Sequence, residues 1–252
     1  MQQGIKIEGL EEVKKGIMGM RQTLPIEIAQ TLSKVAVLAR KGEYTEMKKV
    51  FDRPTPYTLR SLYTKSATVK DLTSKLWVKG KMEAGKGTPA EYYLAPQIFG
   101  GPRRLKRHES ALRRIGILPP NLYCVPAKGA DLNAYGNMKT GQIIKILSYF
   151  QAFGEAGYRA NITEERRKKM AKGTKKIAGI TYFAIRKRRG KMAPGIYMRT
   201  GGQIKMLIVF VKRPHYEPRL LFWETAREVA NKNWKRLFDE AMERTLEKAR
   251  KA

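Results

Sequence analysis

The stretch "ITYFAIRKRRGKMAPGIYMRTGGQIKMLIVFV", residues 180–211, decides the fold class. The segments "ITYFAIR", "GIYMR" and "QIKMLIVFV" are rich in β-branched and aromatic residues with partial alternation, which is typical of strands. "KRRGKMAP" and "TGG" connect them, and their glycines supply the positive φ that tight hairpin turns need. The stretch therefore predicts an antiparallel sheet.

The chain that follows this sheet, from Pro218 to the end, has the strongest helical periodicity in the sequence. Its apolar residues recur at i, i+3 and i+4 with charged residues opposite, which predicts a long amphipathic helix. These residues are Ala226, Val229, Ala230, Trp234, Leu237, Phe238, Ala241, Met242 and Leu246. Such a stripe is typical of a core or a subunit contact.

The N-terminal part of the chain predicts two helices and a hairpin. Leu10, Val13, Ile17 and Met20 have helical spacing, and Pro25 is expected to begin a second helix, with Ile28, Leu32, Val35 and Ala39 on one face. The prolines of "DRPTP", 52–56, end it. After one helical turn in "TPYTLRSL", the segments "YTKSATV" and "LTSKLWVKG" predict a hairpin with "KD" as its turn.

Between the hairpin and the sheet the sequence changes character. Gly- and Pro-rich segments separate short helices expected at 103–115 and 140–152. We interpret residues 81–176 as an insertion with short helices and basic loops in one α+β domain that spans 1–252. The expected fold is an antiparallel sheet packed against the N-terminal helices and the long C-terminal helix.

The composition points to a polyanionic partner. Lys and Arg number 52 against 22 Asp and Glu, which gives a net charge of +30 and a pI near 10.3. Self-repulsion of this size works against compactness unless a polyanion or salt screens it, and nucleic acid is the commonest polyanion. The longest apolar run, "MLIVFV" at 206–211, is far below the about 20 residues that span a bilayer. The N-terminus lacks the apolar core of a signal peptide, so we expect no membrane partner.

Motifs for catalysis are weak. "GKMEAGK", 80–86, resembles a phosphate-binding loop, but Gly87 occupies the position of the magnesium-binding hydroxyl. The carboxylates Asp52, Asp71 and Asp131 lie far apart in the sequence, whereas a nuclease needs two or three around a metal. We expect no catalytic residue, and a metal-dependent nuclease stays an alternative.

The cysteine and histidine content is also low. Cys124 is the one cysteine and His108 and His215 are the two histidines, which provides no ligand set for structural zinc. Cys124 lies in the apolar run "LYCVP" and is expected to be a small buried residue. We predict neither a metal site nor a cofactor.

Two basic segments remain, "EERRKKMAKGTKK" at 164–176 and "RKRRGK" at 186–191. We expect both to be flexible loops on one side of the sheet, where they contact phosphates without reading bases. A solvated loop without a partner is the alternative. The DNA-facing candidates are Arg166, Arg167, Lys168, Lys169, Lys172, Lys175, Lys176, Arg186, Lys187, Arg188, Arg189 and Lys191. The arginine-rich run "RRLKRHESALRR", 103–114, is also expected to suit a polyanionic surrounding.

The order of the parts resembles a known family. "GLEEVKKGI", a second helix, "PTPYTLRSLYTKSA" before a hairpin, and "IVFVKRPHYEPRLLFWETAREV" before a terminal helix are similar to the tail-completion and head-tail joining proteins of tailed bacteriophages. This group includes minor tail protein Z. The resemblance covers residues 4–80 and 177–250. Leu59 follows Thr58 where the family usually has Gly, and the insertion is longer than the usual loop.

This resemblance implies a non-enzymatic virion protein of the neck. It would assemble as a hexameric ring at the head-tail junction, between the connector and the tail terminator or tail tube proteins, after synthesis in the host cytoplasm. Double-stranded DNA would pass through the ring. The alternative is a free-standing basic RNA- or DNA-binding protein, associated with ribosomes or the nucleoid. Assembly separates the two, because the first is a ring and the second a monomer or dimer.

Overall fold

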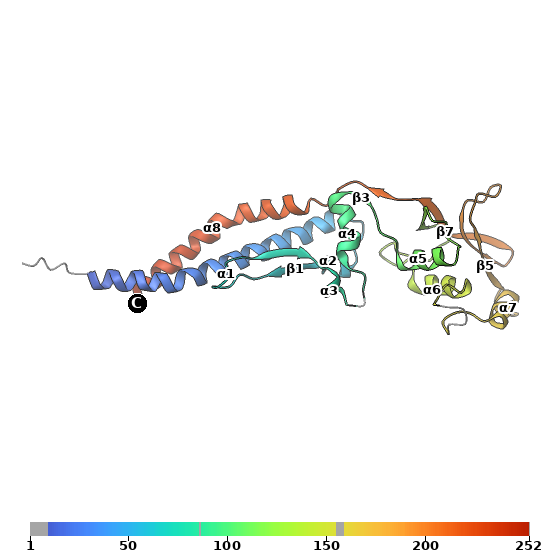
Figure 1. Ribbon diagram of the computed structural model, residues 1–252, viewed down its shortest axis with the longest axis horizontal. Coiled ribbons are helices and arrows are strands. Elements are labelled where there is room, and N and C mark those ends of the chain that lie inside the picture. The colour runs from blue at the N-terminus through green and yellow to red at the C-terminus, as the bar shows by residue number, and fades with distance from the viewer. Residues whose placement is uncertain (1–9, 86, 155–158, 252) are drawn as a thin grey trace, which may run out of the picture. The chain divides into compact units, whose positions relative to one another are not determined.

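The computed structural model describes residues 10–85, 87–154 and 159–251 (Figure 1). The chain divides into two compact units, which are described separately. Unit 1 combines the two ends of the chain, up to Ile98 and from Pro218 onward, and unit 2 is the continuous segment Phe99–Glu217. The expected insertion at 81–176 does not coincide with unit 2, because the main sheet after residue 176 belongs to this unit as well.

Unit 1 is built on two long helices. α1 spans Leu10–Val50 and α8 spans Phe222–Lys251, so the predicted C-terminal helix is confirmed. They run antiparallel and side by side (Figure 1), with Gly19 beside Ala249 and Gly42 beside Val229. A Cβ on Gly42 would lie 2.7 Å from the Val229 Cγ2, so glycine allows this close approach.

The prediction of a helix break at Pro25 is wrong, because α1 is continuous through this residue. Proline removes one backbone hydrogen bond. Packing against α8 on both sides of Pro25 offsets this loss: Glu27 bonds Arg244 and Lys248 of α8, and Gly19 contacts Ala249. The apolar face predicted at 10–17 lies outside the described side chains.

The rest of unit 1 contains short elements. They are α2 (Pro56–Leu59), β1 (Leu62–Lys65), β2 (Lys75–Val78), α3 (Lys81–Ala84) and α4 (Ala90–Phe99). The single helical turn and the β1–β2 hairpin are confirmed. The hairpin turn is one residue earlier than expected, since the backbones of Thr68 and Asp71 bond each other around Val69 and Lys70. Met47, Leu62, Leu94, Leu220 and Phe222 form a core.

Unit 2 contains a four-stranded antiparallel sheet of order β4-β7-β6-β5. The hairpins predicted within 180–211 are confirmed, and β4 adds a strand from the expected insertion. The elements of the unit are β3 (Gly101–Pro102), α5 (Arg107–Arg114), β4 (Leu122–Pro126), α6 (Thr140–Tyr149), α7 (Glu164–Lys172), β5 (Ile180–Ile185), β6 (Gly195–Thr200), β7 (Gln203–Lys212) and β8 (His215–Tyr216). The short strands β3 and β8 pair with each other.

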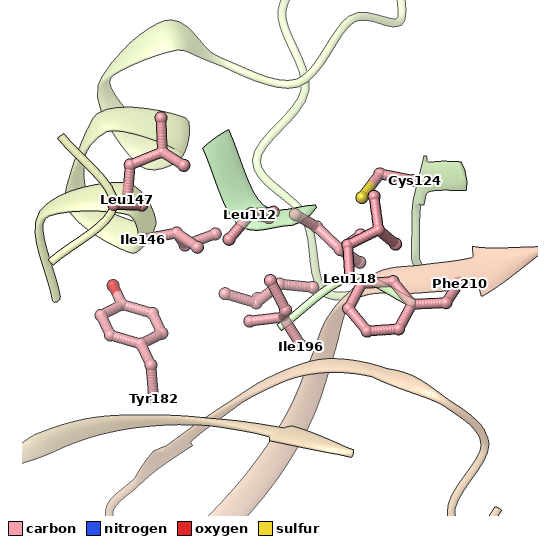
Figure 2. Close-up of a cluster of buried hydrophobic side chains, with 11 residues drawn as sticks. Leu112, Leu118, Cys124, Ile146, Leu147, Tyr182, Ile196 and Phe210 are labelled. Atoms are coloured by element: carbon pink, nitrogen blue, oxygen red, sulfur yellow. The ribbon is translucent and has the colours of Figure 1, made fainter. Parts of the chain in front are cut away.

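The core of unit 2 lies between this sheet and two of its helices (Figure 2). Leu112 of α5 and Ile146 of α6 face Tyr182 and Ile196 of the sheet. Cys124 is also buried in this core, as expected. The α+β class is confirmed, but the helices that cover the four-stranded sheet come from the middle of the chain rather than from its ends.

None of the described helices is long and apolar enough to cross a membrane.

Candidate nucleic-acid interface

The first basic segment is a helix over most of its length, so the prediction of a flexible loop at 164–176 is wrong. The Thr163 side chain caps the start of α7 by accepting a hydrogen bond from the Arg166 N–H at 3.3 Å. Glu164 and Glu165 lie in the first turn, where the helix dipole favours negative charge. Met170 packs against the core of unit 2 and holds the helix on the protein.

The end of α7 is close to the sheet. Gly173 ends the helix with a φ of 69°. A Cβ on Gly179 would lie 1.8 Å from the Ala171 carbonyl oxygen, so only glycine allows the chain to pass the helix end and enter β5.

Arg167 differs from the other candidates of this segment because it has structural partners. Its guanidinium donates to the Tyr149 carbonyl at 2.5 Å and to Glu164 Oε1 at 3.0 Å, and it lies 4.8 Å from the centroid of the Tyr149 ring. These contacts attach α7 to α6. Arg167 is therefore unsuited to binding phosphate.

The remaining cations of this segment are exposed. We call them the helix cluster, which consists of Arg166, Lys168, Lys169, Lys172, Lys175 and Lys176.

The second basic segment forms the tip of the β5–β6 hairpin, as predicted. Arg189 and Met192 exchange backbone hydrogen bonds across this tip, and Gly190 between them has a φ of 55°. The tip cluster consists of Arg186, Lys187, Arg188, Arg189 and Lys191, which are all exposed. Within the described part of the chain, these side chains make two weak hydrogen bonds, from Arg186 to the Gly116 carbonyl and from Arg188 to the Gly190 carbonyl, both at 3.4 Å.

The two clusters lie at opposite ends of β5. The helix cluster precedes Ile180, and the tip cluster follows Ile185 (Figure 1). Five steps of about 3.4 Å place the ends of this strand about 17 Å apart. The sequence between the clusters, "IAGITYFAI" at 177–185, carries no charged residue.

The sequence analysis missed two further cations at the helix-cluster end. Arg199 and Lys205 are exposed, and the tight turn at Gly201 and Gly202 connects their strands beside the start of β5. Ile180 pairs with Thr200, which sets this position. The "TGG" motif at 200–202 predicts the turn between β6 and β7. Counting residues outward from this turn would have shown that Arg199 and Lys205 lie close to it.

Acidic groups do not neutralise the clusters. Apart from Arg167, no candidate forms an ion pair with a carboxylate in the described part of the chain. Unit 2 contains 26 Lys or Arg and six Asp or Glu, so it carries +20 of the total charge of +30. The clusters therefore combine exposure, positive charge and a lack of acidic partners.

The arginine-rich run at 103–114 is largely structural, contrary to expectation. Arg103 donates to both oxygens of the buried Glu109 at 2.6 and 2.7 Å. The backbone N–H groups of Lys106 and Cys124 also donate hydrogen bonds to the Glu109 carboxylate. Burial raises the pKa of Glu109, but these hydrogen bonds outweigh it and hold the pKa below its usual value. Arg113 bonds the Leu122 carbonyl, and Arg114 bonds the Ala152 carbonyl.

Among the described residues, one group of side chains has the spacing of a metal site. Possible ligand atoms of His108, Glu109 and Cys124 lie within 4.8 Å of one another. However, four donors already occupy the Glu109 carboxylate. Burial, followed by the nearby Glu109, raises the pKa of the Cys124 thiol to about 12, which disfavours a thiolate ligand. The group fits a buried polar core better than a cation site.

Fold and clusters together define a two-unit α+β protein with an exposed cationic surface on unit 2. Comparison of the chain with family models, with curated proteins and with solved structures found no match.

Proposed function

We propose that this chain is a structural, non-enzymatic protein that contacts double-stranded DNA without reading its sequence, as a subunit of a bacteriophage neck. One observation carries the DNA contact: eleven exposed Lys and Arg side chains form two clusters without acidic partners in the described chain. Exposed cations of this kind bind phosphates by releasing counterions, and phosphate contacts carry no base information.

The neck assignment draws support from the resemblance noted in the sequence and from the composition of unit 1. The N-terminal helix, the turn at 56–59, the hairpin and the C-terminal helix carry most of that resemblance, and they belong to this one compact unit. The part of the resemblance at 177–217 belongs to unit 2. Unit 2 is inserted between Ile98 and Pro218. In this proposal unit 1 is the assembling part and unit 2 supplies the contact with DNA.

Two measurements test this function separately. Fluorescence anisotropy with unrelated 30-base-pair duplexes tests the DNA contact, and we expect equal affinities that fall steeply with salt. A several-fold dependence on sequence, or no binding at low salt, would contradict it. Electron microscopy tests the assembly. We expect a six-fold ring with connector and tail proteins, whereas a monomer or dimer under all conditions would favour a free-standing nucleic-acid-binding protein.

A further inference from the structure

We infer that the two clusters bind the two backbones of one duplex on either side of a groove, with β5 over the groove. This inference rests on the proposed DNA contact and adds a specific mode of binding to it. It predicts that the protein distinguishes double-stranded from single-stranded DNA, although it reads no sequence.

The argument starts from the order of charges along the chain. A basic segment ends at Lys176, an uncharged segment covers 177–185, and a second basic segment begins at Arg186. The middle segment is largely the strand β5, which is the edge strand of the sheet next to β6. Because a strand is stiff and extended, it holds the two clusters at a fixed separation instead of letting them collapse onto one site.

The separation suits a duplex. The ends of β5 are about 17 Å apart, from a rise of about 3.4 Å per residue. The major groove of B-DNA is about 12 Å wide between its backbones, and the phosphates themselves add to the span. Clusters at the two ends of β5 therefore face phosphates on both sides, while the uncharged strand faces the groove, which carries no phosphates.

The attachment of both clusters to the protein body keeps this geometry. Arg167 fastens α7 to Tyr149, and Gly179 lets the helix end lie against the start of β5. At the other end, Tyr197 of β6 donates from its hydroxyl to the Ala193 carbonyl in the hairpin tip at 2.7 Å. Arg199 and Lys205 add charge at the helix-cluster end. A single strand has no second backbone at a fixed distance, so it can satisfy one cluster only.

The experiment compares four proteins on a 20-base-pair duplex and on either of its single strands. The helix variant carries Lys168→Gln, Lys169→Gln, Lys172→Gln and Lys176→Gln. The tip variant carries Arg186→Gln, Lys187→Gln, Arg188→Gln and Arg189→Gln. The control variant removes the same charge from exposed lysines of unit 1, with Lys41→Gln, Lys70→Gln, Lys81→Gln and Lys232→Gln.

We expect the wild type and the control to prefer the duplex by about tenfold or more. Each cluster variant should bind both forms within about threefold of each other, because one cluster then contacts one backbone. In a fifth protein, Lys168, Lys169, Lys172 and Lys176 are replaced by arginine; it should keep the preference, which distinguishes lost charge from lost folding. Equal preference in all four proteins, or an effect of one cluster alone, would overturn the inference. If the wild type bound neither form of DNA, the proposed function itself would fail.

Discussion

Individual buried charges in this protein have very different environments. Glu27 of α1 is buried but accepts hydrogen bonds from Lys248 and Arg244, and these hold its pKa below the usual value. Glu43 on the same helix is completely buried, and neither carboxyl oxygen has a hydrogen-bond partner. Burial, and then the neighbouring Glu46, raise the pKa of Glu43 to about 8. The nearby Ala226 N–H lowers the pKa by less than these two effects raise it, and Glu224 raises it further.

Glu43→Gln tests this environment through the pH dependence of stability. The ordinary pKa of 4.5 applies to the unfolded chain. Between this value and about pH 8 the folded chain keeps a proton that the unfolded chain releases, so the free energy of unfolding should decrease as pH rises through this window. The decrease is on the order of a few kcal/mol. The variant should lack this decrease, so its stability relative to the wild type should increase from pH 5 to pH 9.

Tryptophan fluorescence in urea provides the measurement, because Trp77, Trp223 and Trp234 are the three tryptophans of the chain and all lie in unit 1. Glu247→Gln, at an exposed position of α8, is the control and should follow the wild type. Parallel pH profiles for Glu43→Gln and the wild type would show that Glu43 is ionised when folded.

Arg103 provides a second test at this scale. Arg103→Ala leaves the fully buried Glu109 without its cation, which should cost about 3–5 kcal/mol of stability in unit 2. Hydrogen exchange measured by mass spectrometry should show lost protection in peptides that cover α5 and β4. Lys145→Ala, at an exposed position of α6, should change nothing. Unchanged protection after Arg103→Ala would mean that the run at 103–114 does not depend on this pair.

At the scale of elements, local sequence patterns predicted the structure well where periodicity is strong. The helix at 222–251 and the hairpins within 180–211 were predicted because their apolar spacing and glycine turns act locally. Two predictions failed, the first because packing overrode a local signal and the second because the local capping signal at Thr163 was overlooked. Pro25 lies inside α1, which α8 stabilises, and the basic segment at 164–172 forms a helix because Thr163 caps it and Met170 anchors it.

The variant Pro25→Ala measures how much the proline inside α1 destabilises this helix. Alanine restores the backbone donor and has a higher helix propensity, so the free energy of unfolding of unit 1 should rise by about 1–3 kcal/mol. Urea unfolding followed by tryptophan fluorescence checks this. Gln30→Ala, at an exposed position of the same helix, is the control. Ser33→Ala would be unsuitable, because the Ser33 hydroxyl accepts a hydrogen bond from the Ala67 N–H. A decrease in stability would mean that α1 depends on the proline.

For the molecule as a whole, the sequence predicted the amount of charge but not its distribution. Formal charge is additive and can be counted, whereas the division into units depends on long-range contacts between the two chain ends. The same limit applies to the candidate site. The tip cluster was placed correctly because a hairpin is local, and the structural role of Arg167 was missed because Tyr149 lies 18 positions away.

The salt dependence of duplex binding by the tip variant, Arg186→Gln, Lys187→Gln, Arg188→Gln and Arg189→Gln, tests the central claim most directly. If these four side chains contact phosphates, the slope of log K against log salt should become less negative by about 3 to 4 relative to the wild type. An unchanged slope would mean that the hairpin tip never meets DNA and would contradict the account.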